Sequence, residues 1–206
     1  MVDCVYTIGH STHSMQRIIE LLTLHDVTAV ADVRSHPYSR FNPQFNRESF
    51  HANLKTAGIS YVFLGRELGA RTQDRGCYVD GTVQYDLVAR TGSFQEGLAR
   101  IVEGVRSQSI ALLCAEKDPL ACHRSILICR HLANRGIGAQ HILDDGRLES
   151  HDQALARLLV ELGLAGGDLF RTRDDLIVEA YDRRGRQIAY TEKEPSAEEP
   201  VREVRG

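Results

Sequence analysis

The sequence predicts an α/β protein with a mainly parallel, Rossmann-like sheet and helices on both faces. Short apolar runs rich in β-branched residues alternate along the chain with longer stretches in which apolar residues recur at helical spacing. Strands that alternate with helices favour a parallel sheet, because each helix carries the chain back across one face of the sheet. At 206 residues, the chain is long enough to bury a sizeable core around such a sheet.

Five of the apolar runs are short enough to be strands, and helical spacing fills the intervals between them. The first helix illustrates the pattern, with Ile18, Ile19 and Leu22 on one face. A break is expected near 91–93 in the third helix, and Gly136 is suited to end the fourth. The predicted strands are 4–9, 27–33, 59–65, 109–116 and 137–143, and the predicted helices are 15–25, 47–57, 85–106, 125–135 and 151–163.

Three segments fall outside this alternation. Residues 66–84 are rich in glycine and lack a period, which predicts a long irregular loop, functional or disordered. After Gly166, the stretch 175–190 predicts a β-hairpin that turns at Arg184-Gly185. The polar end of the chain contains two prolines and predicts a disordered tail. The predicted division is an α/β domain over 1–165, a hairpin extension over 166–190 and a tail over 191–206.

The composition is that of an ordinary globular protein, with 42% hydrophobic residues and a net charge of −3. This charge excludes a global basic field that would hold a long stretch of nucleic acid, but it leaves room for a local basic pocket. No stretch approaches the ~20 apolar residues of a membrane span, and the N-terminus lacks a signal-peptide pattern. Five cysteines, an odd number, favour free thiols, so we expect a cytoplasmic protein with no membrane partner.

Polar residues follow three of the predicted strands at the points where those strands end. The first strand runs into His10, and the second ends around Asp32 and Arg34. The fourth strand ends around Cys114 and Glu116. Because the carboxyl ends of parallel strands lie at one edge of a sheet, where open α/β sheets bind ligands, we expect one functional site there.

Anion binding is the property of this site that the sequence supports best. Arg34, Arg40 and Arg124 supply planar guanidinium donors that match phosphate or carboxylate. Gly9 would let the backbone approach a ligand, and the helix that begins near Ser14 presents free N–H groups to an anion. The alternative is that the arginines pair with nearby carboxylates of the chain itself. The expected ligand-binding residues are Gly9, Ser11, Arg34, Ser35, Ser39, Arg40, His123 and Arg124.

Acid–base and thiol chemistry would fall to four residues of the same segments. Glu116 follows an apolar strand, where partial burial would raise its pKa and suit it to proton transfer, with a simple ion pair as the alternative. Cys122 lies near the start of a helix beside His123 and Arg124, which would lower the pKa of its thiol. Cys114 could equally be a small buried hydrophobe. The expected catalytic residues are Glu116, Cys114, Cys122 and His10.

A metal site is a weaker interpretation of these residues. A mononuclear ion could be held by His10, Cys114 and His123, with Cys122 close by. The spacing does not match the paired motifs of structural zinc sites. We therefore assign no metal ligand and no cofactor from the sequence.

The segment RFNPQFN at 40–46 points to another kind of partner. It combines Arg40 with Phe41, Phe45 and three amide side chains. Aromatic and guanidinium planes beside amide donors suit a nucleobase or single-stranded nucleic acid. The alternative is that the phenylalanines pack into the core.

Several of these motifs resemble a known family. TIGHSTHS, DVRSHPYSRFNPQFN, LGRELGAR and LLCAEKDPLACHR followed by HIL look like the widespread bacterial family called domain of unknown function 488, over about residues 5–150. One departure is visible: Ala70 and Arg71 stand where relatives often have a second glycine before the arginine. The resemblance implies an architecture without an established activity. The family's signature falls on Gly9, His10, Ser11, Asp32, Arg34, Pro37, Ser39, Arg40, Cys114, Glu116, Pro119, Cys122, His123 and Arg124.

Three functions from different classes are compatible with these residues. The first is a hydrolase or transferase that acts on a phosphorylated small molecule, a nucleotide or a nucleic acid at the strand-end site. The second is a non-catalytic module that binds a nucleotide or nucleic acid, in which Glu116 and the cysteines are dispensable. The third is a metal or redox protein that uses His10, Cys114, Cys122 and His123.

Overall fold

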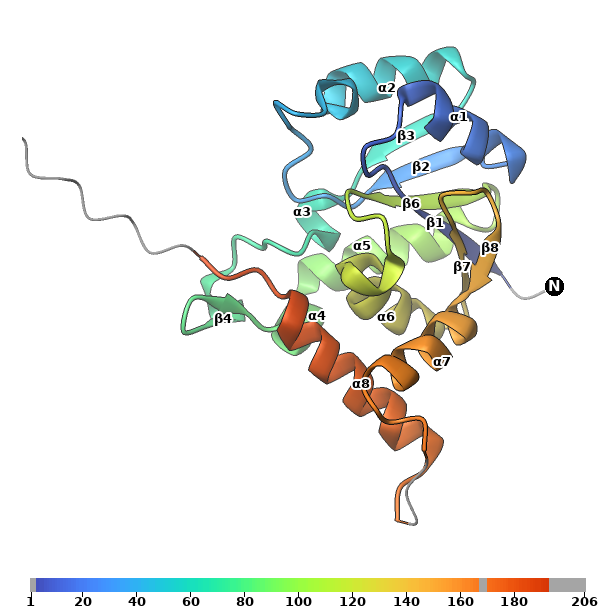
Figure 1. The fold of residues 1–206 in the computed structure, drawn as a ribbon. Coiled ribbons are helices and arrows are strands. Elements are labelled where there is room, and N and C mark those ends of the chain that lie inside the picture. Colours follow the sequence, from blue (N-terminus) through green and yellow to red (C-terminus); the bar gives the residue numbers. More distant parts are fainter. Residues whose placement is uncertain (1–2, 167–169, 193–206) are drawn as a thin grey trace, which may run out of the picture.

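A six-stranded sheet forms the centre of the molecule (Figure 1). The computed structural model describes residues 3–166 and 170–192. The strand order is β3-β2-β6-β1-β7-β8, in which the first five strands run parallel and β8 runs antiparallel to β7 at the edge. The strands are β1 Cys4–Gly9, β2 Ala29–Asp32, β3 Ser60–Phe63, β6 Ile110–Cys114, β7 Gly138–Ile142 and β8 Leu148–Ser150.

The predicted alternation of strands and helices is confirmed. Each predicted strand is present within its expected bounds, whereas the short strand at 148–150 was not predicted. The helix break expected near 91–93 occurs at Thr91, which ends one helix and caps the next by accepting from the backbone N–H of Phe94. The helices are α1 Met15–Leu24, α2 Arg47–Thr56, α3 Gly65–Leu68, α4 Tyr85–Arg90, α5 Gly92–Gly104, α6 Arg130–Ala133, α7 His151–Glu161 and α8 Arg173–Ile188, with a π-helical segment at Arg124–Cys129 before α6.

Helices cover both faces of the sheet, as predicted, and α1 and α2 lie on one face while α5 and α6 lie on the other (Figure 1). Successive residues of the central strand β6 point to opposite faces. Ala111 and Leu113 pack with the buried residues of α1 and α2. Leu112 and Cys114 pack with those of α5 and the segment before α6. The Cys114 side chain is therefore directed to the face that carries residues 122–133.

The predicted C-terminal β-hairpin at 175–190 is wrong, because this stretch forms α8. Leu176, Ala180 and Tyr181 are buried on one side of the helix against residues of α7. The Arg184-Gly185 pair that indicated a turn lies inside the helix, since burial of its apolar face outweighs the low helix propensity of glycine. Within the described residues, no helix, α8 included, combines the length and apolar character needed to cross a membrane.

The segment 66–84 contains short regular elements that the prediction of an irregular loop missed. After α3 it forms a 3₁₀ turn at Arg75–Cys77 and then a two-stranded antiparallel hairpin. The hairpin turns at Asp80 and Gly81, whose positive φ values of 47° and 71° are those of a tight hairpin turn. Its strands are β4 Tyr78–Val79 and β5 Thr82–Val83.

The first residues of the predicted tail dock on this hairpin. Thr191 forms a bridge with Thr82, and the backbone N–H of Glu192 donates to the carbonyl of Gly81. Residues 193–206 of the predicted tail lie outside the described residues.

A chain of buried polar side chains crosses the interior, and we call Thr7, His141, His151 and Tyr181 the histidine relay. The Thr7 hydroxyl lies 2.8 Å from His141 Nδ1, His141 Nε2 lies 3.0 Å from His151 Nδ1, and His151 Nε2 lies 2.7 Å from the Tyr181 hydroxyl. Arg124 Nε–H donates to the Thr7 oxygen over 3.3 Å. If each member then donates to the next, every relay group from Thr7 to His151 both accepts and donates one hydrogen bond, so both histidines are neutral.

We predict that lowering the pH from 7 to 5 destabilises the protein through the relay. Burial lowers the pKa of His141 to about 2 and that of His151 to about 4, from 6.5. Below pH 6.5 the unfolded chain takes up protons that the folded protein excludes. The contribution of the two neutral histidines to stability is therefore fully present above pH 6.5 and decreases as the pH falls below that value. The loss is about 1.4 kcal/mol per pH unit for each histidine, or about 4 kcal/mol for both by pH 5. Urea denaturation at the two pH values measures it.

The variant His151→Gln separates the relay from other titrating groups. It removes one buried titrating site, so the slope of unfolding free energy against pH should fall by about 1.4 kcal/mol per pH unit. The comparison uses only the slope, so a change in stability at pH 7 caused by the substitution does not affect it. An unchanged slope would contradict the prediction.

Candidate functional site

The carboxyl ends of β1, β2 and β6 meet at one edge of the sheet, as the sequence predicts. The backbone N–H groups of His10 and Ser11 donate to the carbonyls of Cys114 and Ala115, each over 2.9 Å. Gly9 makes this approach feasible, because a Cβ atom there would lie 1.8 Å from the Glu116 carbonyl oxygen. Gly9 thus approaches the chain itself, which is a different role from the contact with a ligand that the sequence suggested.

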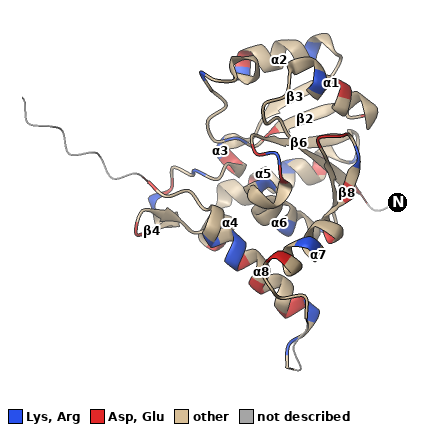
Figure 2. Ribbon diagram, in the orientation of Figure 1, with Lys and Arg blue, Asp and Glu red and all other residues tan. Residues whose placement is uncertain are grey.

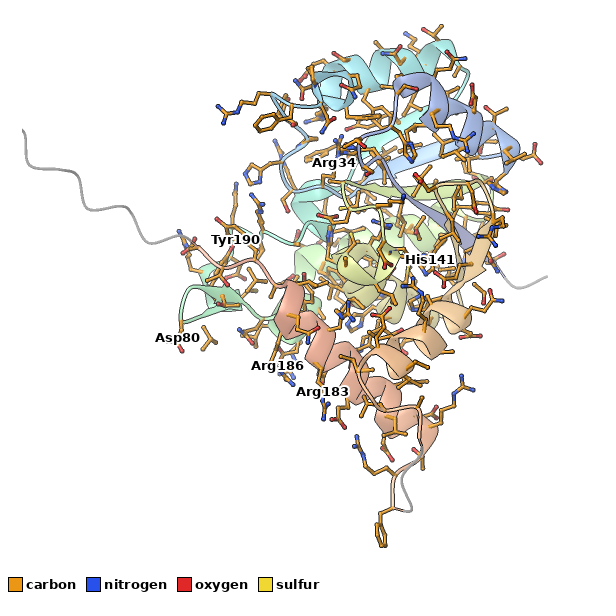
Figure 3. The ribbon with its side chains drawn as sticks, viewed as in Figure 1. Arg34, Asp80, His141, Arg183, Arg186 and Tyr190 are labelled. Atoms are coloured by element: carbon orange, nitrogen blue, oxygen red, sulfur yellow. The ribbon has the colours of Figure 1, made fainter. Side chains whose placement is uncertain are left out.

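Arg34 is engaged in an ion pair with Asp32. Its Nη2 and Nε atoms donate to the two carboxylate oxygens over 2.6 and 2.9 Å, and its backbone N–H adds a third bond. The Tyr61 hydroxyl donates to the same carboxylate over 2.9 Å. Asp32 is fully buried and Arg34 nearly so (Figure 3 labels Arg34). Arg34 therefore pairs with a carboxylate of the chain itself, which was the alternative to binding an anionic ligand.

His10 is buried and neutral. Its Nε2 accepts from Arg34 Nη1 over 3.2 Å, which leaves the proton on Nδ1 to donate to the Ser11 carbonyl over 2.9 Å. Burial and the positive charge of Arg34 lower its pKa to about 4. Its ring stacks on Phe45 with 4.3 Å between centroids. Both ring nitrogens are occupied, so His10 has no lone pair left for a metal ion.

Arg124 is buried and binds neutral acceptors. Its Nη1 and Nη2 atoms donate to the carbonyls of Glu116 and Lys117 over 2.7 and 3.1 Å, and its Nε donates to Thr7. Among the described residues, no carboxylate forms an ion pair with it. The guanidinium therefore clamps the loop that connects Cys114 to Cys122, and it leaves a positive charge beside them.

Cys114, Cys122 and His123 converge at this clamp, and we call them the thiol–imidazole cluster. His123 Nδ1 lies 3.8 Å from Cys114 Sγ and 3.7 Å from Cys122 Sγ, and the three atoms all lie within 4.8 Å of one another. His123 Nε2 donates to the Val33 carbonyl over 3.1 Å, which directs Nδ1 at the sulfur atoms. The thiols are 3% and 2% exposed. All five cysteines of the protein are free.

The charges around the cluster favour one thiolate. Burial alone would raise the pKa of the Cys122 thiol, but the hydrogen bond with Cys114 and the positive charges of Arg124 and His123 hold it well below its ordinary value. The same hydrogen bond, together with burial, raises the pKa of Cys114. Burial and the negative charge of Cys122 also raise the pKa of Glu116. Before any ion binds, the cluster is therefore a thiolate on Cys122 and a thiol on Cys114 beside the positively charged ring of His123, with the Glu116 carboxyl group nearby.

The remaining predicted ligand-binding residues lie in the loop after β2. The Ser35 hydroxyl accepts from the backbone N–H of Arg71 over 2.9 Å, and the Ser39 hydroxyl accepts from two N–H groups of its own loop. Both serines therefore stabilise loop conformation. Arg40 is exposed, and its guanidinium lies over the ring of Phe41, 4.9 Å from the centroid. Of the two phenylalanines in this loop, Phe45 is buried and Phe41 is exposed.

Several residues that contribute to the site were not singled out from the sequence. Tyr61 is an ordinary strand residue without a motif around it, and Thr7 entered the sequence analysis only as the first residue of the TIGHSTHS motif. His141 is a polar residue inside a predicted apolar strand, and this is the pattern that could have revealed the relay.

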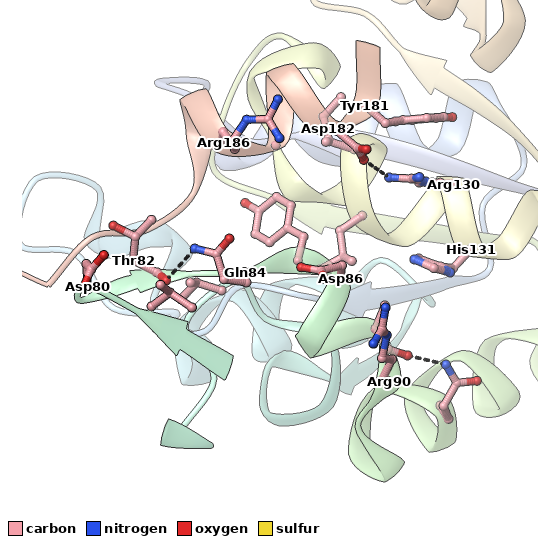
Figure 4. Close-up of a pocket in the computed structure, with 18 residues that line it drawn as sticks. Asp80, Thr82, Gln84, Asp86, Arg90, Arg130, His131, Tyr181, Asp182 and Arg186 are labelled. Atoms are coloured by element: carbon pink, nitrogen blue, oxygen red, sulfur yellow. Dashed lines mark hydrogen bonds and ion pairs between the residues drawn. The ribbon is translucent and has the colours of Figure 1, made fainter. Parts of the chain in front are cut away.

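A cavity of about 1100 Å³ was also missed (Figure 4). It lies among α4, α6 and α8, and Arg130, Tyr181 and Arg186 are among its lining residues. The cavity could not be predicted, because α8 forms part of its wall and the sequence predicted a hairpin in its place.

Comparison with protein families identifies the chain by its sequence. The family model described as Domain of unknown function DUF488 matches residues 14–130, which is more than half of the chain. The chain belongs to this family. The match confirms the resemblance carried by the sequence motifs, and it ends before β7, α7 and α8 of this DUF488 protein. Comparison with curated proteins and with solved structures gave no match.

We predict that Asp32→Asn strongly destabilises the DUF488 protein. The substitution leaves the buried Arg34 guanidinium without its counter-charge, which costs about 3–5 kcal/mol of unfolding free energy. Asp182→Asn is the matched control, because the Arg130–Asp182 pair is partly exposed and should contribute less than about 1 kcal/mol. Urea denaturation of both variants measures the difference, and equal losses would count against the prediction.

Proposed function

We propose that this protein is a metal-dependent hydrolase whose ion is held by the thiol–imidazole cluster. The observation that carries the proposal is the convergence of three ligand atoms from two segments. Donor atoms of a tetrahedral zinc site lie about 3.6 Å apart, given bonds of about 2.3 Å to sulfur and 2.0 Å to nitrogen. The separations of 3.7 and 3.8 Å between His123 Nδ1 and the two sulfur atoms are close to this value.

The surroundings of the cluster support metal ligation. A histidine that ligates a metal usually donates its other N–H to a carbonyl or carboxylate, and the Val33 carbonyl fills this role for His123. The backbone N–H of Arg124 donates to Cys122 Sγ over 3.4 Å, which stabilises a thiolate. Two thiolates and one imidazole suit zinc among the common ions.

The number of ligands favours a catalytic role. Cys114, Cys122 and His123 would supply three ligands to a tetrahedral ion and leave one position for water, whose pKa a zinc ion would lower to about 7. Glu116 follows Cys114 by two residues, and its carboxyl group interacts with the side chains of Cys114 and Cys122. In this proposal Glu116 would accept a proton from the water and return it to the leaving group. Zinc deaminases use the same set, with cysteine and histidine ligands and a separate glutamate.

The two buried arginines do not favour the phosphate-bearing substrates that the sequence suggested. Arg34 is paired with Asp32, and Arg124 is occupied by three acceptors within the chain. Neither guanidinium is free to bind a phosphate. An anionic substrate would depend on exposed arginines such as Arg40.

Metal content tests the proposal. Untagged protein should contain about one zinc ion per chain by elemental analysis, or take one up on dialysis. Cys122→Ser should lose the ion, whereas Cys129→Ser should keep it, because Cys129 is equally buried at the end of the π-helical segment but lies outside the cluster. A protein that folds normally but neither contains zinc nor takes up zinc or cobalt rules out the metal centre.

A second candidate function is nucleophilic catalysis by Cys122 without a metal. The low pKa of its thiol and the N–H bond from Arg124 favour this alternative. Metal-free protein should then be alkylated by iodoacetamide at Cys122 already near neutral pH. Labelling of Cys122 only at alkaline pH would contradict it.

A further inference from the structure

We propose that the carboxyl edge of the sheet binds single-stranded nucleic acid by stacking bases on arginine–aromatic pairs. This inference is independent of the metal centre. Four arginines of this edge lie over aromatic rings, with the guanidinium carbon 4.4–5.4 Å from the ring centroid. We call the four pairs the arginine–aromatic edge, and they are Arg40–Phe41, Arg47–Phe63, Arg71–Tyr190 and Arg75–Tyr78.

Hydrogen bonds join the segments that carry these pairs into one surface. The backbone N–H of Arg47 donates to the Pro37 carbonyl, which ties the start of α2 to the loop after β2. The backbone N–H of Arg71 donates to Ser35, which ties that loop to the segment after α3. The N–H of Val83 donates to the Tyr190 carbonyl and completes the connection to the hairpin. Figure 1 shows these segments along the same side of the molecule.

Planar groups are accessible along this surface. Phe41 is 79% exposed and Tyr38 is 57% exposed, which is unusual for large aromatic side chains. Figure 2 shows basic residues on the loop before α2 and on the segment between α3 and β4. Among the described residues Arg40, Arg47 and Arg71 form no ion pair, whereas Arg75 pairs with Glu192. Guanidinium planes that are free of carboxylates can stack with bases and contact phosphates.

The balance of charge and aromatic surface favours single strands over duplex. A net charge of −3 gives no long-range attraction for a phosphate backbone, so affinity must come mainly from stacking. Unpaired bases offer their faces to aromatic and guanidinium planes, while a duplex hides them. Stacking is tolerant of base identity, so the protein should distinguish single strands from duplex rather than one base sequence from another.

Fluorescence anisotropy of the full chain with labelled oligothymidine, oligouridine and a DNA duplex tests this proposal. At low salt, at least one single strand should bind at least tenfold more tightly than the duplex. Phe41→Ala should weaken that binding about tenfold. Arg106→Ala is the control and should bind as the unsubstituted protein does, because Arg106 is exposed at the opposite edge, between α5 and β6.

A charge-retaining variant distinguishes stacking from simple attraction. Arg71→Lys keeps the positive charge but loses the guanidinium plane, so it should weaken binding nearly as much as Arg71→Ala. Both variants change an exposed side chain and leave the buried core intact. Undetectable binding of both single strands, equal binding of duplex, or full affinity of Arg71→Lys would each overturn the proposal.

Discussion

The buried guanidinium of Arg124 connects most of the features at the carboxyl edge. It binds two carbonyls of the loop between Cys114 and Cys122, and it binds Thr7 on the neighbouring strand. One cation thereby sets the path of the loop and stabilises negative charge on Cys122. These bonds hold the loop in the conformation that keeps both sulfur atoms near Nδ1 of His123.

The arginines of this protein divide into two groups with different physical roles. Arg34 and Arg124 are buried, satisfied by partners in the chain and fixed in place. Arg40 and Arg71 are exposed and lie on aromatic rings, where their planes stay accessible. A charge that is already neutralised or fully hydrogen-bonded organises a site, whereas only a free one can recognise a ligand. The two groups lie at one edge because the strands are parallel.

Much of the fold could be predicted from the sequence, because strong apolar periodicity marks each parallel strand and its following helix. The helix α8 could not, since its buried face exists only against α7, and Gly185 suggested a turn. The proximity of Cys114, Cys122 and His123 could be expected, because they lie at the end of one predicted strand and at the start of the helix that follows it. The engagement of Arg34 and His10 with internal partners depends on side-chain directions that no local pattern specifies.

The histidine relay connects residues outside the range matched by the family model with a residue inside it. Thr7, His141, His151 and Tyr181 all lie outside residues 14–130, yet they end on Arg124 inside that range. Hydrogen bonds connect each relay group from Thr7 to His151 with a partner on either side, so replacement of one alone leaves a buried polar atom without a partner. Related chains are therefore expected to keep or to replace these four residues as a set, which gives the relay a recognisable signature of correlated substitution.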